Sequence, residues 1–167
     1  MEITIAYTSV VGTIDSMETP VKPQGCTNLK LRQLDRVVTR HYDAYLSAAG
    51  IKNTQYSLLS HVAALGPIRP SDLAQRMGLD ASTLTRNLQP LVSQGWLRMG
   101  PGDDARSRLI EATKEGHAKR SEAKQEWKRA QLALNARLGA KQVAALHSLI
   151  ERCMNDLTES ADAIVND

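Results

Sequence analysis

The stretch from Pro70 to Leu97 reads PSDLAQRMGLDASTLTRNLQPLVSQGWL and decides the fold of this chain. Ser71 is a helix-start residue ahead of a short apolar-periodic segment, and Gly78 ends that segment because glycine tolerates a positive φ. Asp80 is then a typical N-cap for a second helix, which we expect to end at Gly95. Two short helices joined by a tight turn that contains glycine predict a helix-turn-helix.

The second of these helices has an apolar face and a polar face. Leu84, Leu88 and Leu91 fall on one stripe at helical spacing and are expected to turn inward. The outward side chains are short hydrogen-bonding groups and one guanidinium, which suit base edges and phosphates: Ser82, Thr83, Thr85, Arg86 and Gln89. Beyond its cap the helix has no acidic residue to repel a polyanion, so DNA contact is favoured over a polar face without a partner.

The segment after the helix-turn-helix predicts a two-stranded hairpin. Strands are expected at 96–99 and 108–111, joined by a loop at 100–105 that is rich in glycine and aspartate. A basic hairpin at this place is the wing of a winged-helix domain. Arg98 and Arg108, one on each strand, are expected to meet DNA phosphates.

The order of these features resembles one known family. The helix-turn-helix is followed by Gly95-Trp96-Leu97, then by Asp104-x-Arg106-x-Arg108-Leu109, then by Thr113-x-x-Gly116 at the start of a long helix. This order resembles the MarR family of bacterial transcriptional regulators over about residues 28–160. The resemblance implies a mainly α fold with a small β-wing, in which a winged helix-turn-helix is joined to a helical dimerisation lobe.

Further contacts with double-stranded DNA are expected outside the second helix. Arg106 is the residue that would enter a narrow minor groove, and Asp104 would orient it, as the resemblance also implies; a simple surface ion pair is the alternative. Helix N-termini attract phosphates, which adds Ser71, Thr54 and Gln55 as candidate contacts. A capping role alone is the alternative for these three residues.

The other helices predict how the chain is organised. Helices are expected at 27–49, 53–65 and 113–138, and relatives suggest that Ile68 joins the wing sheet. After Gly139 a last helix carries a packing seam, in which Cys153 is expected to be buried: Val143, Leu146, Ile150, Cys153 and Leu157. Such seams predict a homodimer, with an intramolecular bundle as the alternative. The expected parts are a flexible arm (1–25), a dimerisation helix (26–50), a DNA-binding lobe (51–112) and dimerisation helices (113–167).

Two sets of residues are candidates for regulation. Cys26 precedes the first helix, and helix N-termini favour the oxidisable thiolate form of a cysteine. It is a candidate sensor of oxidants, and an unreactive thiol is the alternative. The resemblance also implies an effector pocket between the lobes, where a small aromatic anion could contact Arg36, Arg40, His41 and Trp127. Solvated or packed roles are the alternative for each of these four.

Composition narrows the function classes. The net charge of +3 permits nucleic-acid binding, and the scattered histidines and two cysteines predict neither a metal nor another cofactor. No membrane span or signal peptide is recognisable, which predicts a cytoplasmic protein. Nucleophile–base and paired-acid patterns are missing, so we expect no enzyme. The prediction is a repressor that leaves a pseudo-palindromic operator on a small-molecule or oxidative signal; the alternative is a sensor that acts by protein contact without binding DNA.

Overall fold

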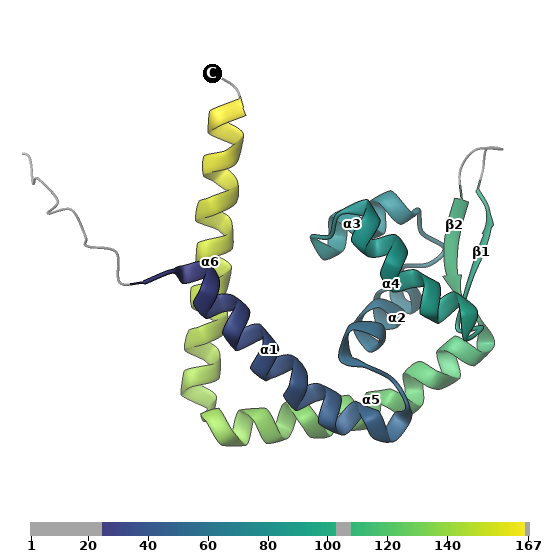
Figure 1. Cartoon of the computed structure of the whole chain (residues 1–167), viewed down its shortest axis with the longest axis horizontal. Helices are drawn as coiled ribbons and strands as arrows, with labels where there is room; N and C mark the ends of the chain where they lie inside the picture. Colours follow the sequence, from purple (N-terminus) through teal and green to yellow (C-terminus); the bar gives the residue numbers. More distant parts are fainter. Residues whose placement is uncertain (1–24, 103–107, 166–167) are drawn as a thin grey trace, which may run out of the picture.

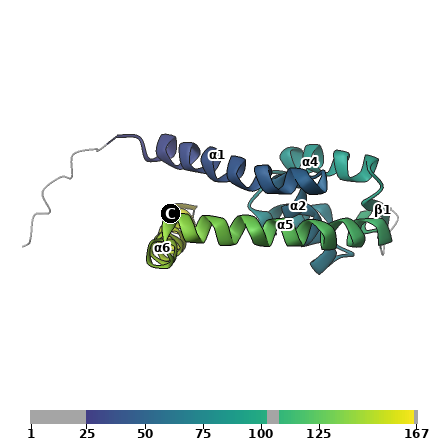
Figure 2. The same ribbon diagram turned by 90° about the horizontal axis from the view of Figure 1, so that it is seen from below.

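The computed structural model describes residues 25–102 and 108–165, with the backbone alone at 159–165. Its elements in chain order are α1 (Thr27–Leu46), the short 3-10 helix η1 (Ser47–Ala49), α2 (Asn53–Leu65), α3 (Pro70–Met77), α4 (Ala81–Ser93), β1 (Leu97–Pro101), β2 (Arg108–Ala112), α5 (Lys114–Leu138) and α6 (Ala140–Val165). α5 forms the base of a wide V, with α6 rising from one end and the lobe of α2, α3, α4 and the hairpin from the other (Figure 1). Viewed from below, α1 and α5 run side by side (Figure 2).

The predicted helix-turn-helix is present as α3 and α4. Gly78 ends α3 in the left-handed region with φ 61°, which glycine adopts at no steric cost. Leu84, Leu88 and Leu91 are buried, as their spacing predicted. The outward face of α4 is thereby fixed by the packing of its leucines.

The N-cap of the first of these helices lies two residues before the predicted one. Ser71 is not the N-cap, because α3 already begins at Pro70 and Arg69 occupies the cap position. Proline suits the first helical position, since its φ is fixed near the helical value and its missing N–H needs no partner there. The Ser71 hydroxyl donates to Oδ1 of Asp72 at 3.0 Å instead of capping the helix.

The hairpin forms the small sheet of the predicted wing. β1 and β2 are antiparallel, with Leu97 opposite Ala112. Ile68 adds the expected single residue to the sheet, because its amide and carbonyl both bond to Ile110, at 3.0 and 2.8 Å. β1 continues through Pro101, so the connecting loop starts later than predicted.

The first strand also begins one residue later than predicted. The Trp96 amide donates to the Leu91 carbonyl at 2.9 Å, which closes the end of α4. The Trp96 carbonyl accepts from the Thr113 amide at 3.0 Å, ahead of α5. Trp96 is therefore bonded to the two flanking helical segments and not to the strand ladder. Asp104 and Arg106, predicted at the wing tip, lie outside the described residues.

The apolar core sits mainly in the winged-helix lobe and joins it to α5. Leu59, Leu73, Leu84 and Ile110 each have at most 1% of their surface exposed. Ala123 and Ala130 of α5 are fully buried, so small side chains let α5 lie close to the helices that it contacts. α5 therefore runs as one continuous helix from the winged-helix lobe to α6.

The predicted seam of α6 is largely uncovered in the single chain. Leu157 is 73% exposed and Ile150 38%, whereas Val143 and Leu146, near the start of α6, are half-buried. Cys153 is exposed, so its expected burial is wrong for one chain. The reason is that α6 rises away from the rest of the chain beyond its first turns (Figure 1). Within the described residues, the intramolecular bundle weighed as an alternative does not form.

Candidate nucleic-acid interface

The outward face of α4 is polar and tightly capped. Ser82 and Thr83 both donate to the Asp80 carboxylate, the Thr83 amide at 2.7 Å to Oδ1 and its hydroxyl at 2.7 Å to Oδ2. The bond from the Ser82 hydroxyl, followed by those from Thr83, holds the pKa of Asp80 far below its ordinary value. The Thr85 hydroxyl donates to the Ala81 carbonyl at 2.8 Å. These three predicted contact residues therefore use their hydroxyl protons inside the helix, and their oxygens are left as acceptors.

Arg86 and Gln89 are the longer side chains of this face, and both are exposed. A guanidinium can bind guanine with two parallel bonds, and an amide can do the same with adenine. Two of the five predicted residues thus supply donors suited to base edges. Pro90 lies next to them within the helix, which continues to Ser93.

A polar hollow lies between α4 and the start of α2. Its volume is about 170 Å³, and it is lined by Lys52, Thr54 and Gln55 on one side and by Arg86, Asn87 and Pro90 on the other. Three residues that were predicted separately from the sequence line this hollow: Thr54, Gln55 and Arg86. It also contains Lys52 and Asn87, which were missed because the pairing of α2 with α4 is tertiary and leaves no spacing signal in the sequence.

The start of α2 is held in place by local hydrogen bonds. Oε1 of Gln55 accepts from the Lys52 amide at 3.0 Å, and Oδ1 of Asp43 accepts from the Asn53 amide at 2.6 Å. Gln55 therefore has the capping role that was weighed as its alternative, while its side chain still borders the hollow. Lys52 and Thr54 are exposed beside it.

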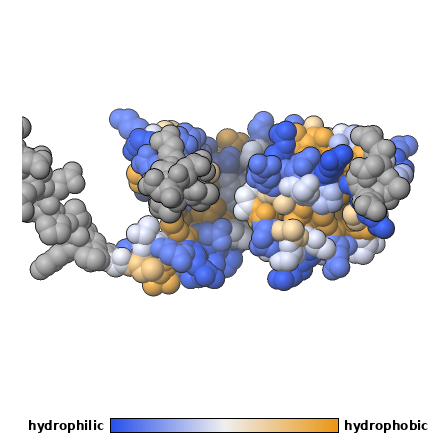
Figure 3. All heavy atoms as spheres, turned by 90° about the horizontal axis from the view of Figure 1, so that it is seen from above, coloured by the Kyte–Doolittle hydropathy of each residue, from blue (hydrophilic) through white to orange (hydrophobic). Residues whose placement is uncertain are grey.

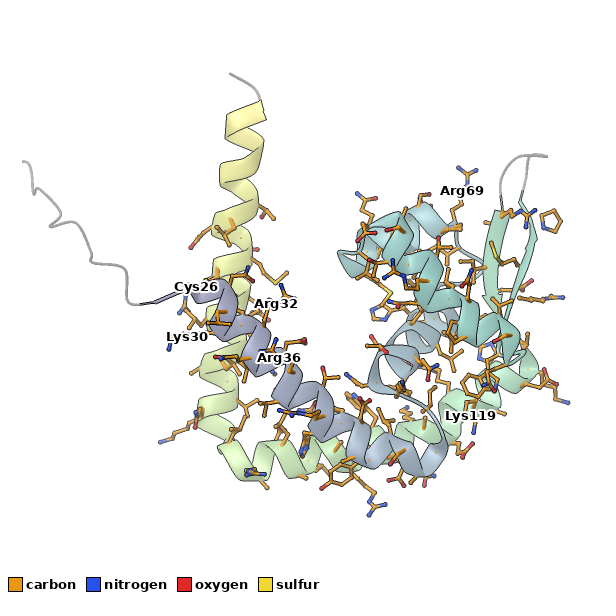
Figure 4. The ribbon with its side chains drawn as sticks, in the orientation of Figure 1. Cys26, Lys30, Arg32, Arg36, Arg69 and Lys119 are labelled. Atoms are coloured by element: carbon orange, nitrogen blue, oxygen red, sulfur yellow. The ribbon has the colours of Figure 1, made fainter. Side chains whose placement is uncertain are left out.

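The wing and the start of α3 add basic side chains. Nε of Arg98 pairs with Oε1 of Glu111 at 2.9 Å across the hairpin, whereas Arg108 is exposed. Arg69, which was not predicted as a contact, precedes α3 and points outward beside the wing (Figure 4). Ser71, next to it in the chain, is exposed at the first turn of α3.

The charge of this lobe is positive on balance. Residues 51–112 contain seven Lys or Arg and five Asp or Glu, of which the structure describes six and three. Each of the three described acids has a polar partner: Asp72 accepts from Ser71, Asp80 is bound in the α4 cap, and Glu111 pairs with Arg98. The excess of two cations in this lobe favours the approach of a polyanion.

The predicted effector residues are placed at different contacts. Nε2 of His41 lies 2.8 Å from the Ala130 carbonyl on α5, and Trp127 stacks on Tyr56 of α2 with the ring centres 6.2 Å apart. Arg36 and Arg40 are exposed on α1. His41 and Trp127 thus pack between helices, while the two arginines face solvent in the single chain.

Cys26 occupies the N-cap position of α1. Its side chain makes no capping hydrogen bond and is exposed, and Lys30 lies one turn further along the helix (Figure 4). The predicted sensor residue is therefore accessible in the single chain. Among the described residues, no cluster of three or more His, Cys, Asp or Glu could hold a metal ion, and no helix is long and apolar enough to cross a membrane.

The polar α4 face, the basic surroundings and the wing define a winged helix-turn-helix DNA-binding protein. A model of the MarR family matches residues 49–107. The chain is 27% identical over 93 residues to the Bacillus subtilis regulator YwoH, covering 56% of this chain and 68% of YwoH. It is 35% identical over 75 residues to MarR of Salmonella typhimurium, covering 44% of this chain and 52% of that MarR. The alignments thus span half to two thirds of these relatives.

Solved structures cover more of the chain. A MarR mutant from E. coli complexed with operator DNA superposes with a TM-score of 0.70 and 27% identity, covering 75% of this chain and 91% of that one. The M. tuberculosis regulator MosR in complex with DNA superposes with a TM-score of 0.63 and 32% identity. The match covers 77% of this chain and 98% of MosR. This chain belongs to the MarR family of transcriptional regulators.

Proposed function

We propose that this chain is a homodimeric repressor that binds a pseudo-palindromic operator through the α4 face, the wing and the start of α2. The observation that carries the proposal is the hollow in which Lys52 of α2 lies beside Arg86 of α4. A helix in the major groove needs contacts to base edges together with contacts to the flanking phosphates. Arg86 and Gln89 would supply the first, and Lys52, Thr54 and Asn87 the second.

The contribution of the wing follows from its position next to α4. Arg106, oriented by Asp104, would enter the minor groove beside each half-site, and Arg108 would meet the backbone. The Asp80 cap supports this arrangement, because its bonds from Ser82 and Thr83 fix the first turn of α4. Ser82, Thr83 and Thr85 would then act as acceptors toward base amino groups, and Ser71 as a contact at the start of α3.

Dimerisation is proposed through the end of the V opposite the winged-helix lobe. A groove of about 420 Å³ runs between α1, α5 and α6, and apolar side chains such as Leu34, Val38, Leu134 and Leu146 line it. Seen from above, hydrophobic residues are also visible at the α1–α6 end of the molecule (Figure 3). A second copy would cover this groove and the exposed seam of α6. We therefore assign 26–50 and 113–167 to the dimerisation lobe and 51–112 to the DNA-binding lobe.

The signal that releases the operator is proposed to act near α1. Cys26 is exposed at the N-cap of this helix, so oxidation could add bulk next to the dimerisation lobe. Reversible loss of DNA binding on treatment with peroxide, absent from Cys26→Ser, would support this route. The second candidate is a small aromatic anion that engages Arg36, Arg40, His41 and Trp127, and a ligand-induced rise in melting temperature is its first test.

Salt-dependent binding to duplex DNA tests the proposed function. Duplexes that the wild-type protein selects from a random pool would be titrated at several salt concentrations. A repressor that neutralises phosphates loses affinity steeply as salt increases, with a slope of about −0.9 per phosphate contact. A sensor that acts by protein contact would select no duplex, and that result would reject the proposal.

A further inference from the structure

We propose that Lys119 is a positioning residue for DNA binding, which fixes the winged-helix lobe relative to the dimerisation lobe. This inference rests on the proposed function, because it concerns the spacing of two recognition helices in a dimer. Lys119 lies on α5 beside the winged-helix lobe (Figure 4) and its side chain is 22% exposed. Its role follows from what its ammonium group contacts.

The ammonium group of Lys119 contacts three separate parts of the chain. Nζ donates to the Ala49 carbonyl at 3.1 Å and to Oε2 of Glu122, one turn further along α5, at 2.7 Å. It also lies 5.6 Å from the centre of the Trp96 ring, where a cation is attracted by the electrons of the ring face. One side chain thus links η1, α5 and the segment that connects α4 to the wing.

Ala49 is the contact of Lys119 that belongs to the proposed dimerisation lobe. It is the last residue of η1, which directly continues α1, and its side chain is buried. Carbonyl oxygens at a helix C-terminus carry partial negative charge and lack partners within the helix. The Lys119 ammonium group supplies both a positive charge and a donor to this end of the α1–η1 segment.

Trp96 is the contact of Lys119 that belongs to the winged-helix lobe. Its amide closes the end of α4 at Leu91, so the position of the Trp96 backbone follows the recognition helix. The Thr113 hydroxyl donates to the Gly95 carbonyl at 2.6 Å and accepts from the Gly116 amide at 3.0 Å, which ties the start of α5 to the same segment. A rotation of α4 relative to α1 would therefore alter the contacts of Lys119 with Trp96 and Ala49 together.

The consequence for function concerns half-site spacing. In a symmetric dimer, two recognition helices must match half-sites that lie about one helical turn of DNA apart, ~34 Å. A stiff link between the lobes favours one spacing, because binding at another spacing strains the link. A loosened link lowers the strain of binding at other spacings. It also weakens binding at the preferred spacing, because the two lobes must then be ordered relative to each other when DNA binds. Lys119 thus contributes to discrimination between spacings, and not to the affinity for a single half-site.

The test compares spacing preference in Lys119→Met, Lys119→Arg and the control Lys124→Met, which replaces an exposed lysine on the same helix. The probes are a duplex selected by the wild type, the same duplex with its half-sites moved apart by one or two base pairs, and a single half-site. For Lys119→Met we expect the ratio of affinities between the selected and the altered spacing to fall about fivefold or more. Its affinity for the single half-site should stay within about twofold of the wild type.

The following results decide whether Lys119 has this role. Lys119→Arg and Lys124→Met should keep the wild-type ratio, since arginine retains the charge and the donors. A wild-type ratio in folded Lys119→Met would overturn the inference while leaving the proposed function intact. If circular dichroism shows that Lys119→Met is unfolded, Lys119→Gln decides by the same ratio, because it removes the charge and keeps a donor. A wild type that selects no duplex would overturn the proposed function and this inference with it.

Discussion

Gly116 lies so close to Trp96 that a Cβ atom on Gly116 would be 2.0 Å from the Trp96 carbonyl oxygen. The helix α5 can approach the end of α4 only because residue 116 has no side chain. Gly116→Ala should therefore destabilise the fold by about 1–3 kcal/mol or more, since the clash is with backbone and cannot be relieved by a rotamer change. The unfolding midpoint in urea measures this effect.

Gly100→Ala is the matched control for this variant. A Cβ on Gly100, in β1, would meet nothing within 4 Å, and its φ is not positive. Its midpoint should stay close to that of the wild type. Equal midpoints for the two variants would show that the approach of α5 to Trp96 does not limit the packing.

Asp80 predicts a pH dependence of stability. The hydrogen bonds from Ser82 and Thr83 lower the pKa of Asp80 in the folded state. A depressed folded pKa contributes stability above the unfolded value of about 3.9, and that stability is lost as the pH falls toward the folded pKa. Asp80→Ala should thus have a lower urea midpoint of unfolding than the wild type at pH 7. The difference between the two midpoints should shrink below about pH 4. A difference independent of pH would contradict the role of the carboxylate charge.

The exposed seam of α6 predicts the oligomeric state. Leu146→Glu combined with Ile150→Glu should dissociate the dimer, because it places two charges in the apolar contact with the partner. Sedimentation at micromolar concentration measures the state, and circular dichroism confirms that the helices persist. Ser148→Glu, at an exposed residue of the same helix, is the control. A wild type that sediments as a monomer would reject the proposed dimer.

Lys52 is expected to contact a DNA phosphate, and such a contact does not depend on the base sequence. Lys52→Gln should weaken binding about equally for selected and unrelated duplexes, because a phosphate is present at every position. The slope of log affinity against log salt should decrease in size by about 0.9, as expected for one lost phosphate contact. Lys128→Gln, at an exposed residue of α5, should leave the slope unchanged. An unchanged slope in Lys52→Gln would place the phosphate elsewhere.

The periodic parts of this fold could be predicted from the sequence, because each left a local pattern. The leucine stripe of α4 and the Asp80 cap occur within one short segment and gave the helix-turn-helix and its outward face. The order of the wing motifs extended this prediction to the family. Ser71 was misassigned as a cap because proline at the first helical position competes with it locally.

Contacts between distant segments could not be predicted in the same way. Lys52 and Arg86 line the same hollow although more than thirty residues separate them in the chain, and neither residue has a pattern that refers to the other. The same holds for Lys119, whose partners Ala49 and Trp96 come from two other elements. The predicted burial of Cys153 was wrong for one chain because a seam pattern shows that a surface is apolar and does not show which chain covers it.

The base preference of Arg86→Ala tests the central claim, that the α4 face reads DNA sequence, most directly. Affinities would be measured for the selected duplex and for duplexes with single base-pair changes in each half-site. We expect Arg86→Ala to lose ~1–3 kcal/mol per half-site on the selected duplex and to become indifferent to one G·C pair that the wild type requires. Arg137→Ala, an exposed arginine near the end of α5, should behave as the wild type. Full affinity and an intact base preference in Arg86→Ala would contradict the account.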